Sequence, residues 1–180
     1  MRGMDNADLK ALIRTIPDYP KAGVQFRDLT TLLLDARGFA LTVERMAARV
    51  SGPVDCIAAI EARGFIFGAA LAREIGAGLV LIRKSGKLPG TARGIDYALE
   101  YGHDRLEMHD DAVGKGARVL LVDDLIATGG TALAAVELVR GIGAAIDEAL
   151  FVVDLPDLGG AARLGEAEVA VESLVTFDGD

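Results

Sequence analysis

The sequence is poor in the residues that crosslink a small protein or bind transition metals. Its 180 residues include one cysteine, Cys56, so no disulfide can form within the chain, and a reducing compartment is expected. The two histidines, His103 and His109, share no metal-ligand spacing with each other or with that cysteine. We therefore expect neither a disulfide framework nor a zinc site of the histidine–cysteine type.

Positive charge and long apolar runs are also scarce. The chain has 19 Lys and Arg against 27 Asp and Glu, a formal net charge of −8, and no basic cluster, which argues against a nucleic-acid partner. No apolar run reaches the roughly 18 residues that cross a bilayer, and residues 1–6 do not form a signal peptide. We expect a cytoplasmic protein without a membrane partner, folded as one domain over residues 1–180.

Strand and helix patterns alternate along most of the chain. Short runs rich in branched apolar residues alternate with segments whose apolar residues recur at helical spacing. The expected strands are 55–60, 78–83, 119–122 and 148–154, and the expected helices are 5–15, 39–50, 64–75 and 132–140. This alternation predicts an α/β fold, a mostly parallel twisted sheet flanked by helices, in which ligands bind beyond the carboxyl ends of the strands.

The most informative segment is 119–131. Four apolar residues predict a strand buried on both faces, Asp123 and Asp124 follow, and Thr128-Gly129-Gly130-Thr131 leads into a helix. The glycines let the backbone approach a ligand, and the N–H groups of a helix start suit a phosphate. The two carboxylates must face something else: hydroxyls, a cation, or both. A ribose 5′-phosphate would match all of these groups.

Two further clusters follow predicted strands. Arg63 lies between a strand end and a helix start, where it is placed to bind a second phosphate; an ordinary helix cap with a surface ion pair is the alternative. The stretch 83–108 is long for a plain connection and predicts a lid with a hairpin-like excursion. In that stretch, Lys84 and Lys87 can bring positive charge to a diphosphate, unless the hairpin is simply solvated.

A third cluster precedes the first predicted strand. In the run Val24-Gln25-Phe26-Arg27, the phenylalanine and arginine can stack on or flank a flat base. On local grounds it is equally reasonable that Phe26 is a core residue and that Arg27 forms a surface pair with Asp28.

Taken together, these segments resemble the adenine phosphoribosyltransferases, a family of type I phosphoribosyltransferases, over nearly the whole chain. The matching motifs are 20–28, 61–65, 83–90, 97–102 and 122–131. The resemblance implies the reaction of adenine with phosphoribosyl diphosphate to give AMP and diphosphate, in purine salvage, with Mg²⁺ and a homodimer. It also implies a type I fold with a hood, formed by residues 1–35 and the C-terminal segment, and a lid loop over 83–108.

By position, the resemblance assigns a role to each motif. Asp123 and Asp124 would hold the ribose hydroxyls, and Arg63 with Lys84 would hold diphosphate. The 5′-phosphate would be bound by Ala127, Thr128, Gly129, Gly130 and Thr131. The adenine site would be lined by Val24, Gln25, Phe26 and Arg27.

The chemistry needs a proton acceptor for adenine as the ring nitrogen attacks. Glu100, a lid carboxylate between Leu99 and Tyr101, is the candidate base, and Asp96 is its rival. Related enzymes for 6-oxopurines tend to carry an aspartate where this chain has Ala127, so the role would move to the lid. Two alternatives remain: another purine specificity, such as xanthine, or a non-catalytic effector module that binds phosphoribosyl diphosphate.

Overall fold

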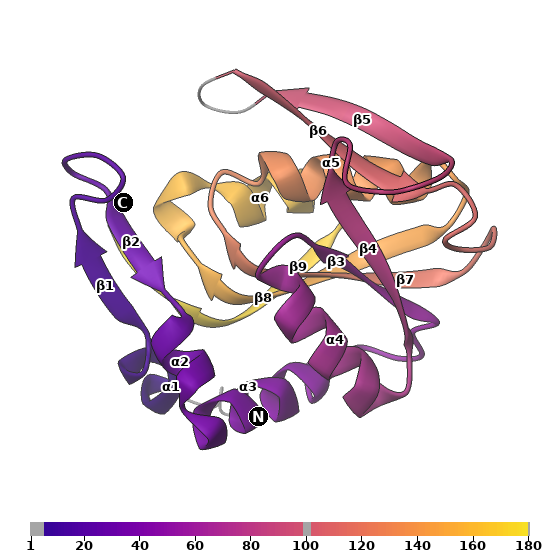
Figure 1. The fold of residues 1–180 in the computed structure, drawn as a ribbon. Coiled ribbons are helices and arrows are strands. Elements are labelled where there is room, and N and C mark those ends of the chain that lie inside the picture. The colour runs from indigo at the N-terminus through magenta and orange to yellow at the C-terminus, as the bar shows by residue number, and fades with distance from the viewer. Residues whose placement is uncertain (1–5, 99–101, 180) are drawn as a thin grey trace.

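A seven-stranded sheet forms the centre of the molecule (Figure 1). The computed structural model describes residues 6–98 and 102–179. The strand order is β5-β6-β4-β3-β7-β8-β9. The five strands β4, β3, β7, β8 and β9 run parallel, whereas β6 pairs antiparallel with both β4 and β5. Their bounds are β3 Cys56–Ile60, β4 Gly78–Lys84, β5 Ala92–Ala98, β6 His103–His109, β7 Arg118–Ile126, β8 Ala145–Asp154 and β9 Ala170–Thr176.

Helices cover both faces of this sheet, which confirms the predicted α/β fold. Helices α3 (Ala36–Ala47) and α4 (Gly64–Ile75) lie on one face, and α5 (Gly130–Arg140) and α6 (Gly160–Glu166) lie on the other (Figure 1). Two apolar cores result, one on each face, as expected for strands that are buried on both sides. A short 3₁₀ turn, η1 (Pro156–Leu158), connects β8 to α6.

Local signals explain where the central helices begin and end. The Asp35 side chain accepts a hydrogen bond of 2.7 Å from the Gly38 N–H and so caps the start of α3. Helix α4 ends at Gly76, whose φ of 73° lies in the left-handed region that favours glycine. The predicted helix 64–75 is confirmed at both ends, whereas the predicted helix 39–50 lies three residues earlier, as α3.

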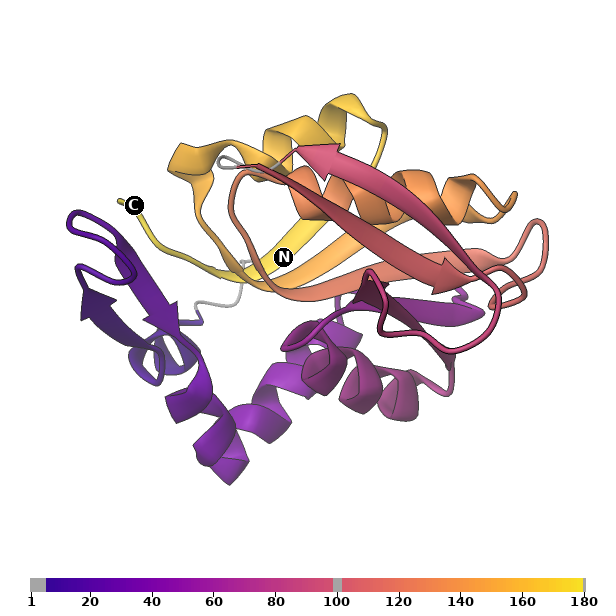
Figure 2. The ribbon, with the colours of Figure 1, turned by 45° about the horizontal axis from the view of Figure 1, so that its top comes forward.

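The N-terminal part of the predicted hood forms a separate two-stranded unit. From here on, the name hood refers to this N-terminal unit alone. It contains α1 (Ala7–Ala11), β1 (Arg14–Pro17), β2 (Gln25–Asp28) and α2 (Thr30–Leu34), and its hairpin stands apart from the central sheet in Figures 1 and 2. The helix predicted over 5–15 was therefore partly wrong, because α1 ends at Ala11 and β1 begins at Arg14. Backbone pairing of β1 with β2, in the register Ile16↔Phe26, overrides the helical spacing of the apolar residues.

The Asp28 carboxylate connects β1, β2 and α2 at the base of this hairpin. Asp28 is buried, pairs with Arg14, and accepts hydrogen bonds from the Thr30 hydroxyl (2.7 Å) and the Thr30 N–H (3.0 Å). The bonds from Thr30, together with Arg14, lower the pKa of Asp28 to about 2. The charged form of Asp28 therefore stabilises the junction of β2 with α2.

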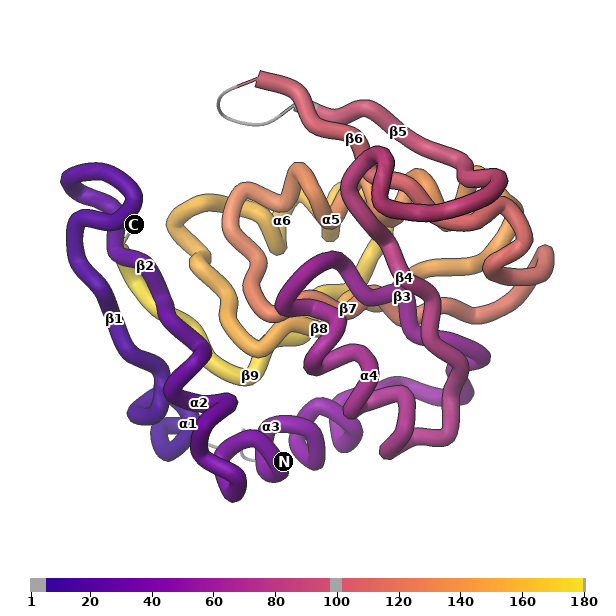
Figure 3. Tube along the Cα trace, in the orientation of Figure 1, coloured from indigo at the N-terminus to yellow at the C-terminus, as the bar shows by residue number. Residues whose placement is uncertain are grey.

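The predicted hairpin in the lid region is present as β5 and β6. These strands pair along their length from Ala92↔His109 to Ala98↔His103, but β6 meets β4 at only two positions, Arg83↔Glu107 and Lys84↔Leu106. The trace in Figure 3 shows this hairpin reaching past the sheet above α5. In the part of the chain that the structure describes, no helix is long and apolar enough to cross a membrane.

Candidate active site

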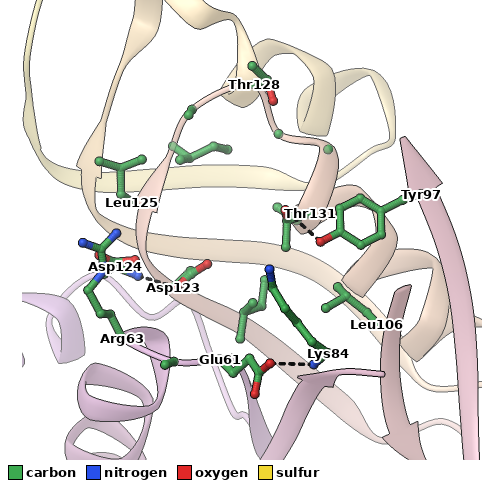
Figure 4. Close-up of a pocket in the computed structure, with 17 residues that line it drawn as sticks. Glu61, Arg63, Lys84, Tyr97, Leu106, Asp123, Asp124, Leu125, Thr128 and Thr131 are labelled. Atoms are coloured by element: carbon green, nitrogen blue, oxygen red, sulfur yellow. Dashed lines mark hydrogen bonds and ion pairs between the residues drawn. The ribbon is translucent and has the colours of Figure 1, made fainter. Parts of the chain in front are cut away.

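A pocket of about 490 Å³ opens at the carboxyl ends of the central strands (Figure 4). This is the edge at which ligands of parallel sheets are expected. It is lined by residues 60–63, Lys84, Tyr97, Leu106 and 123–132. The pocket thus brings Arg63 and Lys84 together with the segment that contains both acids and the Thr-Gly-Gly-Thr motif, although these three parts of the chain lie far apart in the sequence.

Residues 127–131, which we call the phosphate loop, form one wall of the pocket. Gly129 has φ 78°, a left-handed conformation, and α5 begins at Gly130, two residues earlier than predicted. Its first N–H groups and the Thr131 hydroxyl therefore face a site with the positive end of the helix dipole behind it. This arrangement is suited to a phosphate group.

The phosphate loop is supported from behind by the start of α6. The Gly160 N–H donates to the Ala127 carbonyl (2.9 Å), and the Arg163 guanidinium donates to the Thr128 carbonyl (2.5 Å). A Cβ at Gly160 would lie 2.2 Å from the Ala127 oxygen, so the two segments touch backbone to backbone. This support was not predicted from the sequence, although the pair Gly159-Gly160 at a helix start repeats the pattern of Gly129-Gly130.

The acidic pair lies on the floor of the pocket. Strand β7 continues to Ile126, so Asp123 and Asp124 lie within its carboxyl-terminal half rather than following it as predicted. Burial, together with the neighbouring Asp124 carboxylate, raises the pKa of Asp123 well above its usual range. Burial also raises the pKa of Asp124, an effect that Arg63 opposes from 2.7 Å. Two buried carboxylates side by side are costly unless a ligand or cation satisfies them.

Arg63 connects the acidic pair to the rim of the pocket. Its Nε lies 2.7 Å from the Asp124 Oδ2 (Figure 4). Its guanidinium carbon also lies 5.5 Å from the centre of the Phe26 ring in the hood. Gly64, the next residue, allows α4 to start close to the acids, because a Cβ there would lie 2.6 Å from the Asp123 Oδ1.

The lysines predicted to bind diphosphate are each paired in this structure. Lys84 forms an ion pair with Asp104 (2.9 Å), which raises its pKa, and it extends into the pocket (Figure 4). Lys87 does not line the pocket; it pairs with Glu61 (2.9 Å), a nearly buried carboxylate that also accepts from Arg83 (3.0 Å). Although burial raises the pKa of Glu61, these bonds outweigh that effect and lower it.

Tyr97 is a pocket residue that the sequence analysis did not assign. Its hydroxyl lies 3.5 Å from the Thr131 Oγ1 of the phosphate loop (Figure 4) and, on the other side, 3.4 Å from the Asp104 Oδ2. Burial raises the pKa of this phenol. Both hydrogen bonds are long, so the hydroxyl can turn toward a bound anion. Its position at the start of the motif 97–102, within the predicted lid, is the signal that could have suggested it.

The residues predicted to bind adenine lie in the hood rather than in the pocket wall. Val24 and Gln25 are half-buried near the hairpin turn, and Phe26 packs edge-on against Tyr19 with ring centres 5.2 Å apart. Arg27 is buried. Phe26 contacts a pocket residue, since its ring lies beside the guanidinium of Arg63. The predicted base Glu100 lies outside the described residues, and its rival Asp96 is exposed and pairs with Arg105.

Carboxylates rather than histidines or cysteines are the groups here that suit a metal ion. In residues 6–98 and 102–179, no group of three or more His, Cys, Asp or Glu side chains forms a metal cluster. Asp123 and Asp124 supply hard oxygen donors, which Mg²⁺ prefers, but they are too few to hold it without ligand oxygens and water.

The comparisons with known proteins agree with this geometry. A family model for the phosphoribosyl transferase domain matches residues 30–159. A curated relative, the adenine phosphoribosyltransferase of Sphingopyxis alaskensis, is 59% identical over 174 residues, which cover 96% of this chain and 95% of that protein. The chain belongs to the adenine phosphoribosyltransferase family.

Solved structures of this family share its fold. The adenine phosphoribosyltransferase of Thermoanaerobacter pseudethanolicus has a TM-score of 0.91 at 45% identity, covering 96% of this chain and 100% of that one. The Giardia lamblia enzyme, solved with 9-deazaadenine, has a TM-score of 0.90 at 34% identity, covering 97% and 98%. The predicted type I fold and the predicted family, a class of pentosyltransferases, are therefore confirmed.

Proposed function

We propose that this chain transfers the 5-phosphoribosyl group from phosphoribosyl diphosphate to adenine, releasing AMP and diphosphate in purine salvage. The observation that carries the proposal is the buried acidic pair between two anion sites in one pocket, the phosphate loop on one side and Arg63 with Lys84 on the other. A ribose with phosphate at both ends fits this order of groups. The relatives named above, one of them bound to an adenine analogue, support adenine as the acceptor.

The residues of the pocket match the charges of the reaction. Displacing diphosphate from the anomeric carbon builds positive charge on the ribose, which favours the charged forms of Asp123 and Asp124 beneath it; their oxygens also accept hydrogen bonds from its hydroxyls. The leaving diphosphate gains negative charge, which Arg63 and Lys84 offset. The phosphate loop fixes the far end of the substrate, so the reacting carbon is held in place.

Mg²⁺ is the cation that fits this donor set. When bound, it would neutralise part of the diphosphate charge. Asp123 and Asp124 would meet it with their oxygens or through the ribose hydroxyls, because Mg²⁺ keeps much of its water. Chelation is expected to abolish turnover, and added Mg²⁺ is expected to restore it.

Adenine must lose a ring proton as its nitrogen attacks. We assign that proton to Glu100, since Ala127 leaves the phosphate-loop side of the base without an acceptor. Removal of a carboxylate from water raises its pKa, which makes it a better general base. The assignment is tested by substitution, as described in the Discussion.

A homodimer is also part of the proposal. Three large apolar side chains are exposed on neighbouring elements: Ile66 of α4 (41%) and Leu79 and Leu81 of β4 (40% each). Such a patch is suited to a second copy of the chain. Analytical ultracentrifugation should give twice the monomer mass, and Leu81→Glu should shift the protein toward monomer.

The reaction is tested by a panel of bases with phosphoribosyl diphosphate and Mg²⁺, following diphosphate release. Adenine should be turned over faster than hypoxanthine, guanine or xanthine. Equal or faster turnover of xanthine would indicate a different purine specificity. Tight binding of phosphoribosyl diphosphate without turnover of any base would favour the effector module.

A further inference from the structure

The segment after β9 crosses from the sheet to the hood. Residues 177–179, which we call the C-terminal tail, run beside β2 in both Figure 1 and Figure 2. The Phe177 N–H donates to the Asp154 carbonyl at the end of β8 (3.1 Å), and the Gly179 N–H donates to the Asp157 carboxylate (2.8 Å). The C-terminal tail is thus fixed to the body of the molecule at two points.

The hood meets this tail through one arginine. The Arg27 guanidinium donates to the carbonyls of Asp178 (3.1 Å) and Gly179 (3.3 Å) and lies 4.6 Å from the centre of the Phe177 ring. It also donates to the Thr15 hydroxyl on the neighbouring strand β1 (2.7 Å). The residue is only 8% exposed, so these contacts are largely shielded from water and stronger than they would be on the surface.

Neighbouring residues of β2 point to opposite sides of the hairpin. Phe26 points toward the pocket, where its ring lies 5.5 Å from the Arg63 guanidinium. Arg27 points the other way, onto the C-terminal tail, and it does not line the pocket. A change at the Arg27 side chain therefore reaches the purine side of the pocket by moving β2.

We infer that Arg27 is a positioning residue that fixes the hood to the body through the C-terminal tail and thereby sets the affinity for the purine. This inference rests on the proposed function and on the expectation from the sequence that residues 24–27 line the adenine site. It departs from the sequence-based interpretation that the Arg27 side chain itself flanks the base. Phosphoribosyl diphosphate, bound by the central sheet, should be insensitive to the contact.

Two variants remove the contact from its two sides. Arg27→Met keeps the length of the side chain but not its donors, and Phe177→Ala removes the ring on which the guanidinium lies. Each should raise the KM for adenine by roughly tenfold, with kcat and the KM for phosphoribosyl diphosphate changed by less than about twofold. Hydrogen exchange of residues 14–28 should be faster in both variants.

A matched control is available on the same end of the chain. Arg49 of the body donates to the Ser173 carbonyl in β9 (2.5 Å), so Arg49→Met also removes an arginine bound to this C-terminal region, but away from the hood. It should leave both KM values and the exchange of 14–28 unchanged. If it raised the adenine KM as much, general stability would explain the effect and the inference would be wrong.

Other outcomes are equally decisive. An unchanged adenine KM in both variants, or a rise in Arg27→Met alone, would overturn the inference, the latter because the side chain would then act on the base directly. A wild-type protein that fails to turn over adenine would refute the proposed function instead. In that case faster exchange of residues 14–28 in both variants would support the link to the tail, and unchanged exchange would refute it.

Discussion

The close contact between Gly160 and the phosphate loop allows a sharp test of how the 5′-phosphate site is built. In Gly160→Ala, the new Cβ would lie 2.2 Å from the Ala127 oxygen and 2.8 Å from the Gly129 nitrogen. Ordinary contacts are about 3.5 Å, so the loop must move by roughly 1 Å. The backbone of Gly160 is not in a left-handed conformation, so the effect is steric rather than conformational.

A displacement of this size has two expected consequences. Misplacing binding groups by about 1 Å can cost about 10²-fold in rate, so kcat/KM for phosphoribosyl diphosphate should fall by roughly 10- to 10²-fold. Overpacking costs about 1–3 kcal/mol of folding free energy, which corresponds to a loss of roughly 2–12 °C in Tm at this chain length. The KM for adenine should change least, because the residues assigned to adenine, 24–27, lie in the hood and not in the loop.

Gly165 provides the control within the same helix. It is exposed, and a Cβ there would meet nothing within 4 Å, so Gly165→Ala should leave the kinetics unchanged and keep or raise Tm. Steady-state kinetics with each substrate varied, together with calorimetry, measure both effects. If Gly160→Ala lowered Tm but kept the wild-type KM for phosphoribosyl diphosphate, the spacing of the loop would not depend on Gly160 and our reasoning would be refuted.

Three further predictions concern the acids. Asp123→Asn and Asp124→Asn should each cost about 2–4 kcal/mol of transition-state stabilisation, measured as kcat/KM for phosphoribosyl diphosphate; near-normal turnover with a lower Tm alone would make the pair structural. Glu100→Gln should lower kcat by about 10²–10⁴-fold without weakening the binding of phosphoribosyl diphosphate, whereas Asp96→Asn should have little effect; the opposite result would move the role to Asp96. The pKa of Asp28 is about 2 when folded and about 4 when unfolded, so its stabilisation is complete above pH 4 and is lost as the pH falls toward 2. Acid unfolding of Asp28→Asn should lack this component, and an acid transition of unchanged shape would argue against it.

The sequence predicted the elements whose signals are local. Both ends of helix 64–75 were predicted because Gly64 and Gly76 flank a continuous apolar pattern. The site was found because two acids and a Thr-Gly-Gly-Thr motif follow a run of apolar residues typical of a buried strand. Pairing between distant segments was harder to predict. Strand β1 exists because it pairs with β2, and its own residues continue the spacing of a helix.

Side-chain partners across the sheet were beyond sequence reasoning for the same reason. Nothing near Lys87 in the sequence indicates that it pairs with Glu61, 26 residues earlier. The role of Gly160 likewise depends on a contact with residues more than 30 positions away. These contacts form only when the strand order brings the segments together, so a local pattern carries no trace of them.

The ion pair between Arg63 and Asp124 has a consequence for ligand selection. Each of the two charges has the other as its partner, and an isolated anion that took Arg63 would leave the buried Asp124 carboxylate unpaired, which is unfavourable. A molecule that brings oxygens to Arg63 and hydroxyls to Asp124 at the same time avoids that cost. We therefore expect the pocket to bind an intact sugar that carries both kinds of group more tightly than an isolated anion of the same charge.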